Sequence, residues 1–413
     1  MISRYPVRRA LVEHKGGDNI YKTIIIPVKC NKTDYQYLLG LNRLSAEVWN
    51  LCVKLDKEYQ EANGKQIPFK ELQYAVKGCN NLHSKGISLV FRKYFYSRKA
   101  MWQSINAKHE NSNKAKMPYK EKRYFNTGWD YQAIRYDYDK GIIKLARPQL
   151  GKEGCGKRQP QVKCYVKNLP TNIVEIELLY RKGLKLAIKY KEPDIENLIQ
   201  STNAASIDLG EIHSIASIDT NGNSIIITGR KLRSIKRLRD KELGQLRSKR
   251  SKCTKGSRQY KKYSRAMYNL KFKTDKQILD SVHKITKLYL DYCLENQIGI
   301  VYYGDLDSAT RNTRGRVKSH NGEKLNEWNH GLITQHLTNK LSRYGIQMIK
   351  VKEYYTSKKC PSCGQHNAPN GRIYTCPCGY EQHRDIVGAI NILNDNRGTH
   401  LKRYANKKYL RIA

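Results

Sequence analysis

Four cysteines gather within nineteen residues near the end of the printed sequence: Cys360, Cys363, Cys376 and Cys378. Four thiolates at about 2.3 Å give Zn²⁺ a closed tetrahedral shell, which is the arrangement of a structural zinc site and not of a catalytic one. Gly364 and Gly379 follow the two pairs directly, and glycine permits the tight turn that directs backbone N–H groups at sulfur. The spacing therefore predicts a structural zinc site of the ribbon type.

The second cysteine pair departs from the usual ribbon spacing. It reads Cys-Pro-Cys, with one residue between the thiols, whereas the first pair has two. One of the two knuckles is therefore strained or altered, and His366 or His383 stays open as a replacement for one of the two later cysteines.

Three aspartates end predicted strands or begin a predicted helix: Asp208, Asp305 and Asp385. A single aspartate in such a place is usually a turn or N-cap residue. Together, the three match what two-metal phosphodiester cleavage requires, because several carboxylates from separate strands must hold two Mg²⁺ ions about 3.5–4 Å apart. Oxygen ligands suit Mg²⁺, which accepts a substrate phosphate as a further ligand. The aspartates are therefore candidate ligands of a nuclease centre.

The elements that must position these acids follow from the pattern of the second half. The segment 204–228 reads as three strands with an Asn-Gly hairpin, and the first strand ends at Asp208. The segment 230–287 carries 21 Lys or Arg against four acids, with Leu and Ile at helical spacing, which predicts a long basic helical hairpin. Further strands are expected before Asp305 and over "GIQMIKVKE", which closes at Glu353.

The first half of the sequence has a different residue pattern. "YKTIIIPVK" at 21–29 reads as a strand, and helical periodicity follows to about residue 114. Short alternating strands separated by Asp-Lys-Gly and Arg-Lys-Gly turns then occupy 119–193. This order predicts a small β-barrel that is split in sequence by a helical segment.

Charge indicates the class of partner. The 413 residues include 78 Lys or Arg against 36 Asp or Glu, a net charge of +42, and a fold with this excess repels itself unless a polyanion neutralises it. Nucleic acid is the first candidate and an acidic membrane surface the second. The sequence has no run of about 18 apolar residues and no apolar signal core at its start. With seven of eleven cysteines scattered, we expect a reduced, intracellular protein that does not enter a membrane.

Several of these motifs together resemble the TnpB family, the transposon-encoded, RNA-guided relatives of type V CRISPR effectors and of the Fanzor nucleases. "SIDLG" at 206–210 is similar to the first RuvC motif, and "TSKKCPSCG" with "CPCGYEQHRDIVGAINIL" is similar to the ribbon and the third RuvC motif. "LNEWNHGLITQHLTNKLSRYGIQMIKV" matches the stretch between the second motif and the ribbon. The resemblance is specific from about 204 to 394; before that it rests on layout alone.

The resemblance implies an RNase H-like sheet in which Asp208 and Asp385 are the first- and third-motif aspartates. The middle motif departs from the family, because Gly304 precedes Asp305 where a glutamate is expected. Some family members have this glutamate relocated downstream, so we expect Glu353 to be the third acid. Asp305 as the middle acid and an inactive site remain the alternatives.

The expected fold class is α+β and multidomain. The resemblance implies a wedge-type β-barrel in two parts (1–30 and 116–198), an inserted helical recognition domain (31–115), a RuvC-like nuclease domain (199–354) with a basic helical hairpin (230–297), an inserted zinc ribbon that binds the target nucleic acid (355–382), a final RuvC segment (383–396) and a basic tail (397–413).

The expected function is RNA-guided cleavage of double-stranded DNA next to a short flanking motif, with Mg²⁺ (or Mn²⁺) and a structural Zn²⁺. The expected partners are a guide RNA and double-stranded target DNA, with no membrane, and the protein is expected to be a monomer that is cytoplasmic and nucleoid-associated in a prokaryote. Alternatives are a nuclease-inactive RNA-guided repressor, a compact type V CRISPR effector and an RNA-independent junction nuclease. The expected nucleic-acid contacts are Arg230, Lys231, Arg233, Lys236, Arg237, Lys261, Lys262 and Arg384.

Overall fold

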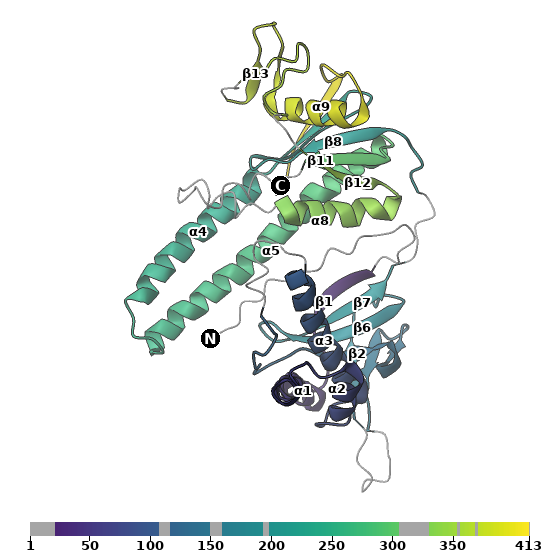
Figure 1. Ribbon diagram of the computed structural model, residues 1–413, viewed down its shortest axis with the longest axis vertical. Coiled ribbons are helices and arrows are strands. Elements are labelled where there is room, and N and C mark those ends of the chain that lie inside the picture. Colours follow the sequence, from purple (N-terminus) through teal and green to yellow (C-terminus); the bar gives the residue numbers. More distant parts are fainter. Residues whose placement is uncertain are drawn as a thin grey trace. The chain divides into compact units, whose positions relative to one another are not determined.

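The computed structural model describes residues 21–106, 116–148, 159–192, 198–304, 330–352, 356–367 and 371–412. The chain divides into two compact units, Met1–Asp194 and Ile195–Ala413 (Figure 1). Within the described residues, no helix combines the length and the apolar character that a membrane span needs.

The first unit contains three helices: α1 (Lys32–Asn63), α2 (Phe69–Ala75) and α3 (Ser84–Asn106). The start of α1 is fixed by Asn31, whose side-chain oxygen accepts a hydrogen bond of 2.7 Å from the backbone N–H of Asp34. Its end is fixed by Gly64, which adopts a left-handed conformation with φ of 65°. The helical segment predicted between the strands is therefore present.

Two antiparallel sheets complete the first unit. One has the order β1-β7-β6-β2, built from β1 (Tyr21–Pro27), β7 (Leu184–Lys191), β6 (Ile173–Tyr180) and β2 (Thr127–Asp130). The other consists of β3 (Ile134–Asp137), β4 (Ile142–Leu145) and β5 (Val162–Tyr165). Because β1 pairs with β7, the helices are inserted between strands of one sheet, as predicted. The described strands form two open sheets and are not hydrogen-bonded into a closed barrel.

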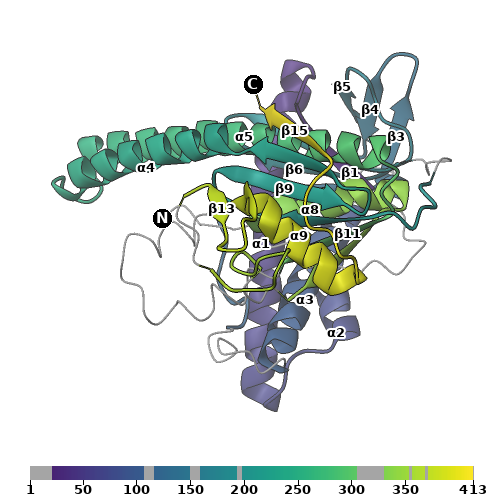
Figure 2. The ribbon, with the colours of Figure 1, turned by 90° about the horizontal axis from the view of Figure 1, so that it is seen from above.

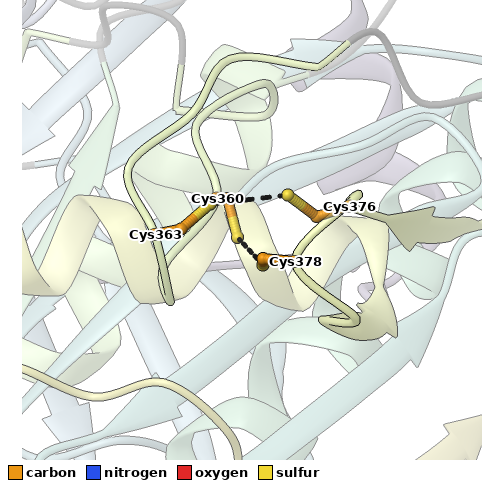
Figure 3. Close-up of side chains that lie close together, drawn as sticks. All are labelled: Cys360, Cys363, Cys376 and Cys378. Carbon is orange, nitrogen blue, oxygen red and sulfur yellow. Dashed lines mark hydrogen bonds between the residues drawn. The ribbon is translucent and has the colours of Figure 1, made fainter.

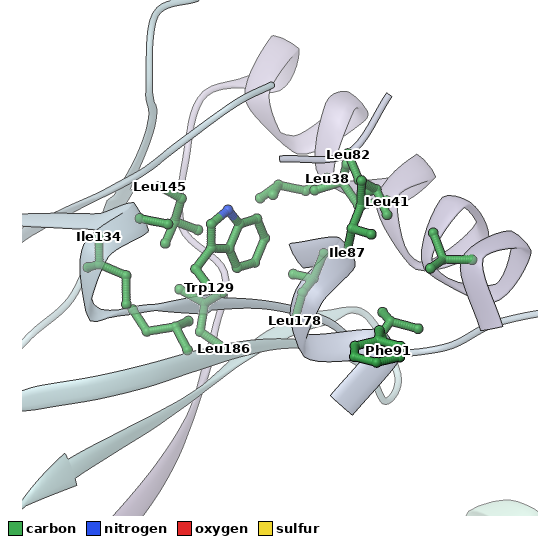
Figure 4. Close-up of a cluster of buried hydrophobic side chains, with 14 of the residues drawn as sticks. Leu38, Leu41, Leu82, Ile87, Phe91, Trp129, Ile134, Leu145, Leu178 and Leu186 are labelled. Atoms are coloured by element: carbon green, nitrogen blue, oxygen red, sulfur yellow. The ribbon is translucent and has the colours of Figure 1, made fainter. Parts of the chain in front are cut away.

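The core of the first unit joins both sheets to the helices. Trp129 of β2 is buried among side chains of the sheets, including Leu178 and Leu186, and side chains of α1 and α3 extend the same cluster (Figure 4). The indole N–H of Trp129 donates to the carbonyl oxygen of Ala146 at 2.9 Å, so this large side chain is buried without losing its polar partner.

A buried ionic network crosses this helical layer. Asp56 of α1 is fully buried and accepts hydrogen bonds from Tyr94 Oη at 2.6 Å and Arg98 Nη1 at 3.0 Å, both on α3. The backbone N–H of Ile67 donates to the same carboxylate at 3.2 Å. The Asp56–Arg98 ion pair is therefore buried, and removing either residue would leave the other as an unpaired buried charge.

The second unit is built on one six-stranded sheet with the order β12-β11-β8-β9-β10-β15. Its strands are β12 (Gln347–Val351), β11 (Ile300–Gly304), β8 (Ala204–Asp208), β9 (His213–Asp219), β10 (Asn223–Thr228) and β15 (Asn406–Arg411). β12, β11 and β8 run parallel to one another, β9 is antiparallel to β8 and β10, and β15 is parallel to β10.

Helices cover both faces of this sheet. α5 (Arg258–Glu295) and α8 (His330–Leu341) pack on one face, and α9 (Arg384–Arg397) packs on the other (Figures 1 and 2). α4 (Arg230–Ser251) lies side by side with α5. The two helices form the basic hairpin that the sequence predicted over 230–297.

The segment assigned to a basic tail contributes β15 to the sheet. Its lysines and arginine are exposed, but Leu410 packs against the cluster beneath α5 and α8. The sequence does not reveal this strand, because only one residue of "NKKYLR" has an aliphatic side chain that faces the core. The remaining predicted domain boundaries stay predictions.

Candidate functional site

Three parallel strands of the second unit end at the same edge of the sheet. In their register Tyr303 is paired with Ile207, and Gly304 is paired with Val351, so Asp208 belongs to this edge as the last residue of β8. Ligand sites in such sheets form beyond the carboxyl ends of the strands. Asp305 and Glu353, the two candidates for the middle acid, lie outside the described residues.

Asp208 lies against helix α9. Side chains alternate along β8, and Ser206 faces α9, since its Oγ donates to the carbonyl oxygen of Ala389 at 2.6 Å. A Cβ added to Gly388 would lie 2.6 Å from Oδ2 of Asp208, so the helix backbone and this carboxylate are in direct contact. Asp385 is in the first turn of the same helix, three residues before Gly388, on the face that meets the strand. The structure therefore brings Asp208 and the start of α9 together.

Asp385 is hydrogen-bonded to a histidine that the sequence did not single out. Nδ1 of His213 lies 2.6 Å from Oδ2 of Asp385, and the hydroxyl of Tyr409 lies 3.3 Å from Nε2 of the same ring. His213 is only 4% exposed. The three residues come from β9, α9 and β15, so the predicted tail supplies one partner of this cluster.

A β-bulge turns His213 toward α9. Ile227 is paired with Ile215, but the next residue, Thr228, is paired with His213, so Ser214 is the extra residue of β9. Ile215 packs in the cluster beneath α5 and α8. Strict alternation would place His213 on that same face, and the bulge reverses its direction. No periodicity of the sequence carries this signal.

The electrostatics keep Asp385 ionised. Burial favours the neutral carboxyl, but the hydrogen bond with His213 and the electrostatic interactions with His213, His383 and Arg372 outweigh it and lower the pKa of Asp385 below its ordinary value. Arg372 Nη1 lies 3.7 Å from Oδ2. Burial lowers the pKa of His383 to about 4, so that imidazole is neutral near physiological pH.

The four cysteines converge as predicted. Their Sγ atoms all lie within 4.8 Å of one another, with 3.8 Å between Cys360 and Cys378 and 3.5 Å between Cys363 and Cys376 (Figure 3). A tetrahedral zinc with bonds of about 2.3 Å needs sulfur atoms roughly 3.8 Å apart, so the four thiolates fit Zn²⁺. His383 groups instead with His213 and Asp385. Neither it nor His366 belongs to the thiol cluster.

The two glycines of the ribbon form the expected tight turns, but their N–H groups are directed at carbonyl oxygens and not at sulfur. Gly364 and Gly379 have φ of 77° and 78°, a region that L-residues rarely adopt. Their N–H groups donate to the carbonyl oxygens of Cys360 and Cys376 at 2.9 and 3.0 Å. A hydrogen bond from the backbone of Cys378 is the main cause that lowers the pKa of Cys376 to about 7. The loop thus favours the thiolate form at Cys376, whereas the pKa values of the other three cysteines are raised.

Helix α9 also carries the ribbon, whose short strands are β13 (Ile373–Thr375) and β14 (Glu381–His383). Asn391 Nδ2 donates to the carbonyl oxygens of Thr356 and Lys359 at 2.7 and 2.8 Å. Val387 packs in one buried cluster with two of the cysteines and with Tyr374 and Tyr380. One helix therefore carries Asp385, contacts Asp208 and anchors the four-cysteine cluster.

The predicted nucleic-acid contacts are mostly on the hairpin surface. Six are exposed: Arg230, Lys231, Arg233, Arg237, Lys261 and Lys262. Lys236 and Arg384 are partly buried. Arg233 forms an ion pair of 3.1 Å with Glu211, which leaves the other exposed members as the clearer candidates for phosphate contact.

Family models and relatives of known proteins match stretches of this chain. A family model described as "Probable transposase" matches residues 187–310, and one described as "Cas12f1-like, TNB domain" matches 330–392. A TnpB-like protein of Methanocaldococcus jannaschii is 27% identical over 196 residues, which are 46% of this chain and 68% of that protein. The CRISPR-associated endodeoxyribonuclease Cas12f1 of Sulfoacidibacillus thermotolerans is 26% identical over 118 residues, 28% of this chain and only 26% of that protein.

A solved structure shows a similar fold. The chain in a cryo-EM structure of a Cas12f1–sgRNA–target DNA complex superposes with a TM-score of 0.65 at 16% identity, covering 88% of this chain and 83% of that one. The two proteins therefore share a mixed α and β fold across both units.

Proposed function

We propose, from the premise that this chain is a member of the TnpB family, that it is an RNA-guided DNA endonuclease encoded by a transposable element. The observation that carries the proposal is the contact between Asp208 and Gly388, which brings the ends of β8 and α9 together. In this proposal, a carboxylate from a strand end and one from a helix start would share a nuclease site in the unit that also carries the basic hairpin.

The nuclease centre would consist of Asp208, Asp385 and a third acid. Glu353 follows the last residue of β12 by two positions, and Asp305 directly follows β11. In sequence, Asp305 is therefore close to the end of the strand that neighbours β8, and Glu353 to the end of the strand after that. Carboxylate oxygens fit Mg²⁺ or Mn²⁺, and when bound these ions supply an activated water and stabilise the leaving oxygen. The protein's own contribution is to hold the carboxylates in place through β8 and α9.

Nucleic-acid binding would fall to the basic surfaces. A guide–target heteroduplex is read through its backbone shape while base pairing supplies the sequence. The exposed lysines and arginines of α4 and α5 suit that role, and the first unit would act as the wedge and recognition domains that hold the RNA scaffold and the flanking DNA motif. The zinc ribbon, inserted in sequence before α9, would touch the DNA strand that enters the nuclease site.

The first test is to purify the protein from cells that carry its native locus and to sequence the RNA that accompanies it. One dominant RNA with a constant scaffold and a variable end supports guided recognition. Heterogeneous RNA that washes off in moderate salt would contradict it and would favour the RNA-independent junction nuclease.

Cleavage assays with that RNA then test the acids. Asp208→Ala and Asp385→Ala should abolish cutting of a matched DNA duplex in Mg²⁺. Glu353→Ala should do the same while Asp305→Ala should not, and the reverse result would assign the middle role to Asp305.

One observation favours a second function. The strand β11 ends in Gly304, where the family's middle motif has its glutamate. If the native protein binds guide RNA and target DNA but does not cut in Mg²⁺ or Mn²⁺, it is an RNA-guided repressor. Genes that neighbour the locus distinguish a transposon nuclease from a compact CRISPR effector.

A further inference from the structure

We propose that His213, His383 and Asp385 bind a divalent transition-metal ion at a site separate from the four cysteines. The proposal goes beyond nuclease function, because it concerns metal binding by the free protein. It shares one residue, Asp385, with the proposed nuclease centre.

The geometry of the three side chains carries the proposal. One ligand atom from each lies within 4.8 Å of the other two, and the two imidazole rings are 5.0 Å apart between centroids. Nitrogen and oxygen ligands at about 2.1 Å from a tetrahedral ion are roughly 3.4 Å from each other. The His213–Asp385 pair, which starts at 2.6 Å, would open by about 0.8 Å to admit an ion, and a pair at the 4.8 Å limit would close by about 1.4 Å.

His383 provides the second, independent observation. Its Nδ1 atom is buried, and among the described residues it has no hydrogen-bond partner. A buried polar atom without a partner is costly and calls for an explanation. A metal ion that accepts the Nδ1 lone pair supplies that missing partner.

Tyr409 can support His213 as a metal ligand. Its hydroxyl lies 3.3 Å from Nε2 of His213 and can either donate or accept a hydrogen bond. A metal-bound imidazole usually donates its second N–H to a neighbouring acceptor. In the tautomer that binds the ion through Nδ1, the single ring proton of His213 is on Nε2, and this Nε2–H can donate to the Tyr409 oxygen.

Positive groups nearby limit how strongly the site binds a cation. Arg372 Nη1 lies 3.7 Å from the Asp385 carboxylate, but its side chain is 48% exposed and can swing into solvent. Besides burial, the positive charge of Lys407 contributes to the lowered pKa of His383. Two imidazoles select Zn²⁺, Co²⁺ or a similar ion over Mg²⁺, which prefers oxygen ligands. The expected ligand is therefore a transition ion, with Zn²⁺ as the probe.

Zinc stoichiometry of the full chain tests the proposal without RNA, DNA or cleavage. At buffered micromolar free Zn²⁺, the native chain should hold two zinc ions, and His383→Ala should hold one. His400→Ala, which removes an exposed histidine, should still hold two. Tyr409→Phe should weaken the second ion by about 10- to 100-fold.

Cobalt substitution shows which site is lost. His383→Ala should retain the sulfur-to-cobalt charge-transfer absorption of the four thiolates, which also shows that the variant is folded, and should lose the bands of the nitrogen–oxygen site. One zinc ion per native chain, unchanged by His383→Ala, overturns the proposal. Two zinc ions in a chain that never cuts DNA would leave the metal site standing and remove the nuclease function.

Discussion

Gly388 and Asp208 are in contact, because a Cβ on Gly388 would lie 2.6 Å from Oδ2 and 3.1 Å from Cγ of that aspartate. The helix backbone thus approaches a strand end as closely as a glycine allows. In α9 this glycine has a positional role, since a glycine inside a helix otherwise costs about 1 kcal/mol relative to alanine.

Gly388→Ala should therefore impair cleavage although it improves helix propensity. The added methyl must push α9 or the Asp208 carboxylate aside, and overpacking of this kind costs about 1–3 kcal/mol. A displacement of about 1 Å at a catalytic group can lower the rate about a hundredfold. Single-turnover cleavage with saturating guide RNA and DNA measures the effect.

Gly244→Ala is the matched control for this change. Gly244 also lies inside a helix, α4, but nothing is within 4 Å of an added Cβ. This variant should cut at the native rate and gain up to about 1 kcal/mol in unfolding free energy. Equal cleavage rates for the two variants would remove Gly388 from the positioning of the site.

Lys261 and Lys262 on α5 should contribute to RNA binding through phosphate contacts. Each phosphate contact adds about 1 to the slope of log affinity against log salt concentration. The double substitution Lys261→Ala, Lys262→Ala should weaken guide-RNA binding and lower this slope by about 1–2. Filter binding across a salt series gives both quantities.

Lys287→Ala on the same helix is the control for the lysine pair. Lys287 Nζ forms an ion pair of 2.6 Å with Asp291, so its charge is already balanced locally. Its loss should leave the salt slope unchanged. If all three lysines alter the slope alike, the hairpin acts only through its overall charge.

Cys378→Ser should release zinc from the ribbon, whereas His366→Ala should not. The Sγ atom of Cys378 belongs to the thiol cluster and His366 is outside it. Metal analysis should show one ion fewer per chain for the serine variant. The amides of Gly364 and Gly379 should then exchange faster with solvent, because zinc loss frees the turns they close. Zinc loss in His366→Ala would instead indicate that His366 is the fourth zinc ligand.

Asp56→Ala should destabilise the first unit by about 3–5 kcal/mol, because it leaves the buried Arg98 guanidinium without its counter-ion. Urea unfolding, with the first unit followed by hydrogen exchange, measures the loss. The double variant Asp56→Ala, Arg98→Met should recover part of it, since no unpaired charge then remains. A double variant that is no better than the single one would mean that Asp56 acts through Tyr94 and Ile67.

The sequence predicts features that depend on local pattern. The strand that ends at Asp208, the basic hairpin and the four converging cysteines all follow from periodicity, charge and spacing, and each is present. What it misses depends on pairing between distant segments. His213 and Asp385 are 172 residues apart, and a single bulge at Ser214 decides which face His213 occupies.

Strand β15 was missed for a related reason. A parallel edge strand is recognised by its partner, and β10 precedes β15 by almost two hundred residues. With lysines on both faces, its own residues read as a solvated tail. The first unit has open sheets because of how its strands pair with one another. No local pattern in 119–193 specifies that pairing.

The position of β15 in the chain has a consequence for how the protein is made. Among the described residues, the last strand of the first unit ends at Lys191, so this unit can fold while the ribosome is still translating the second. The outer edge of the second sheet pairs Asn223 with Asn406, so this pairing cannot form before residue 406 has been synthesised. A prematurely terminated chain would therefore carry a folded first unit, with Asp208 in place but with neither Asp385 nor Tyr409 to complete the site.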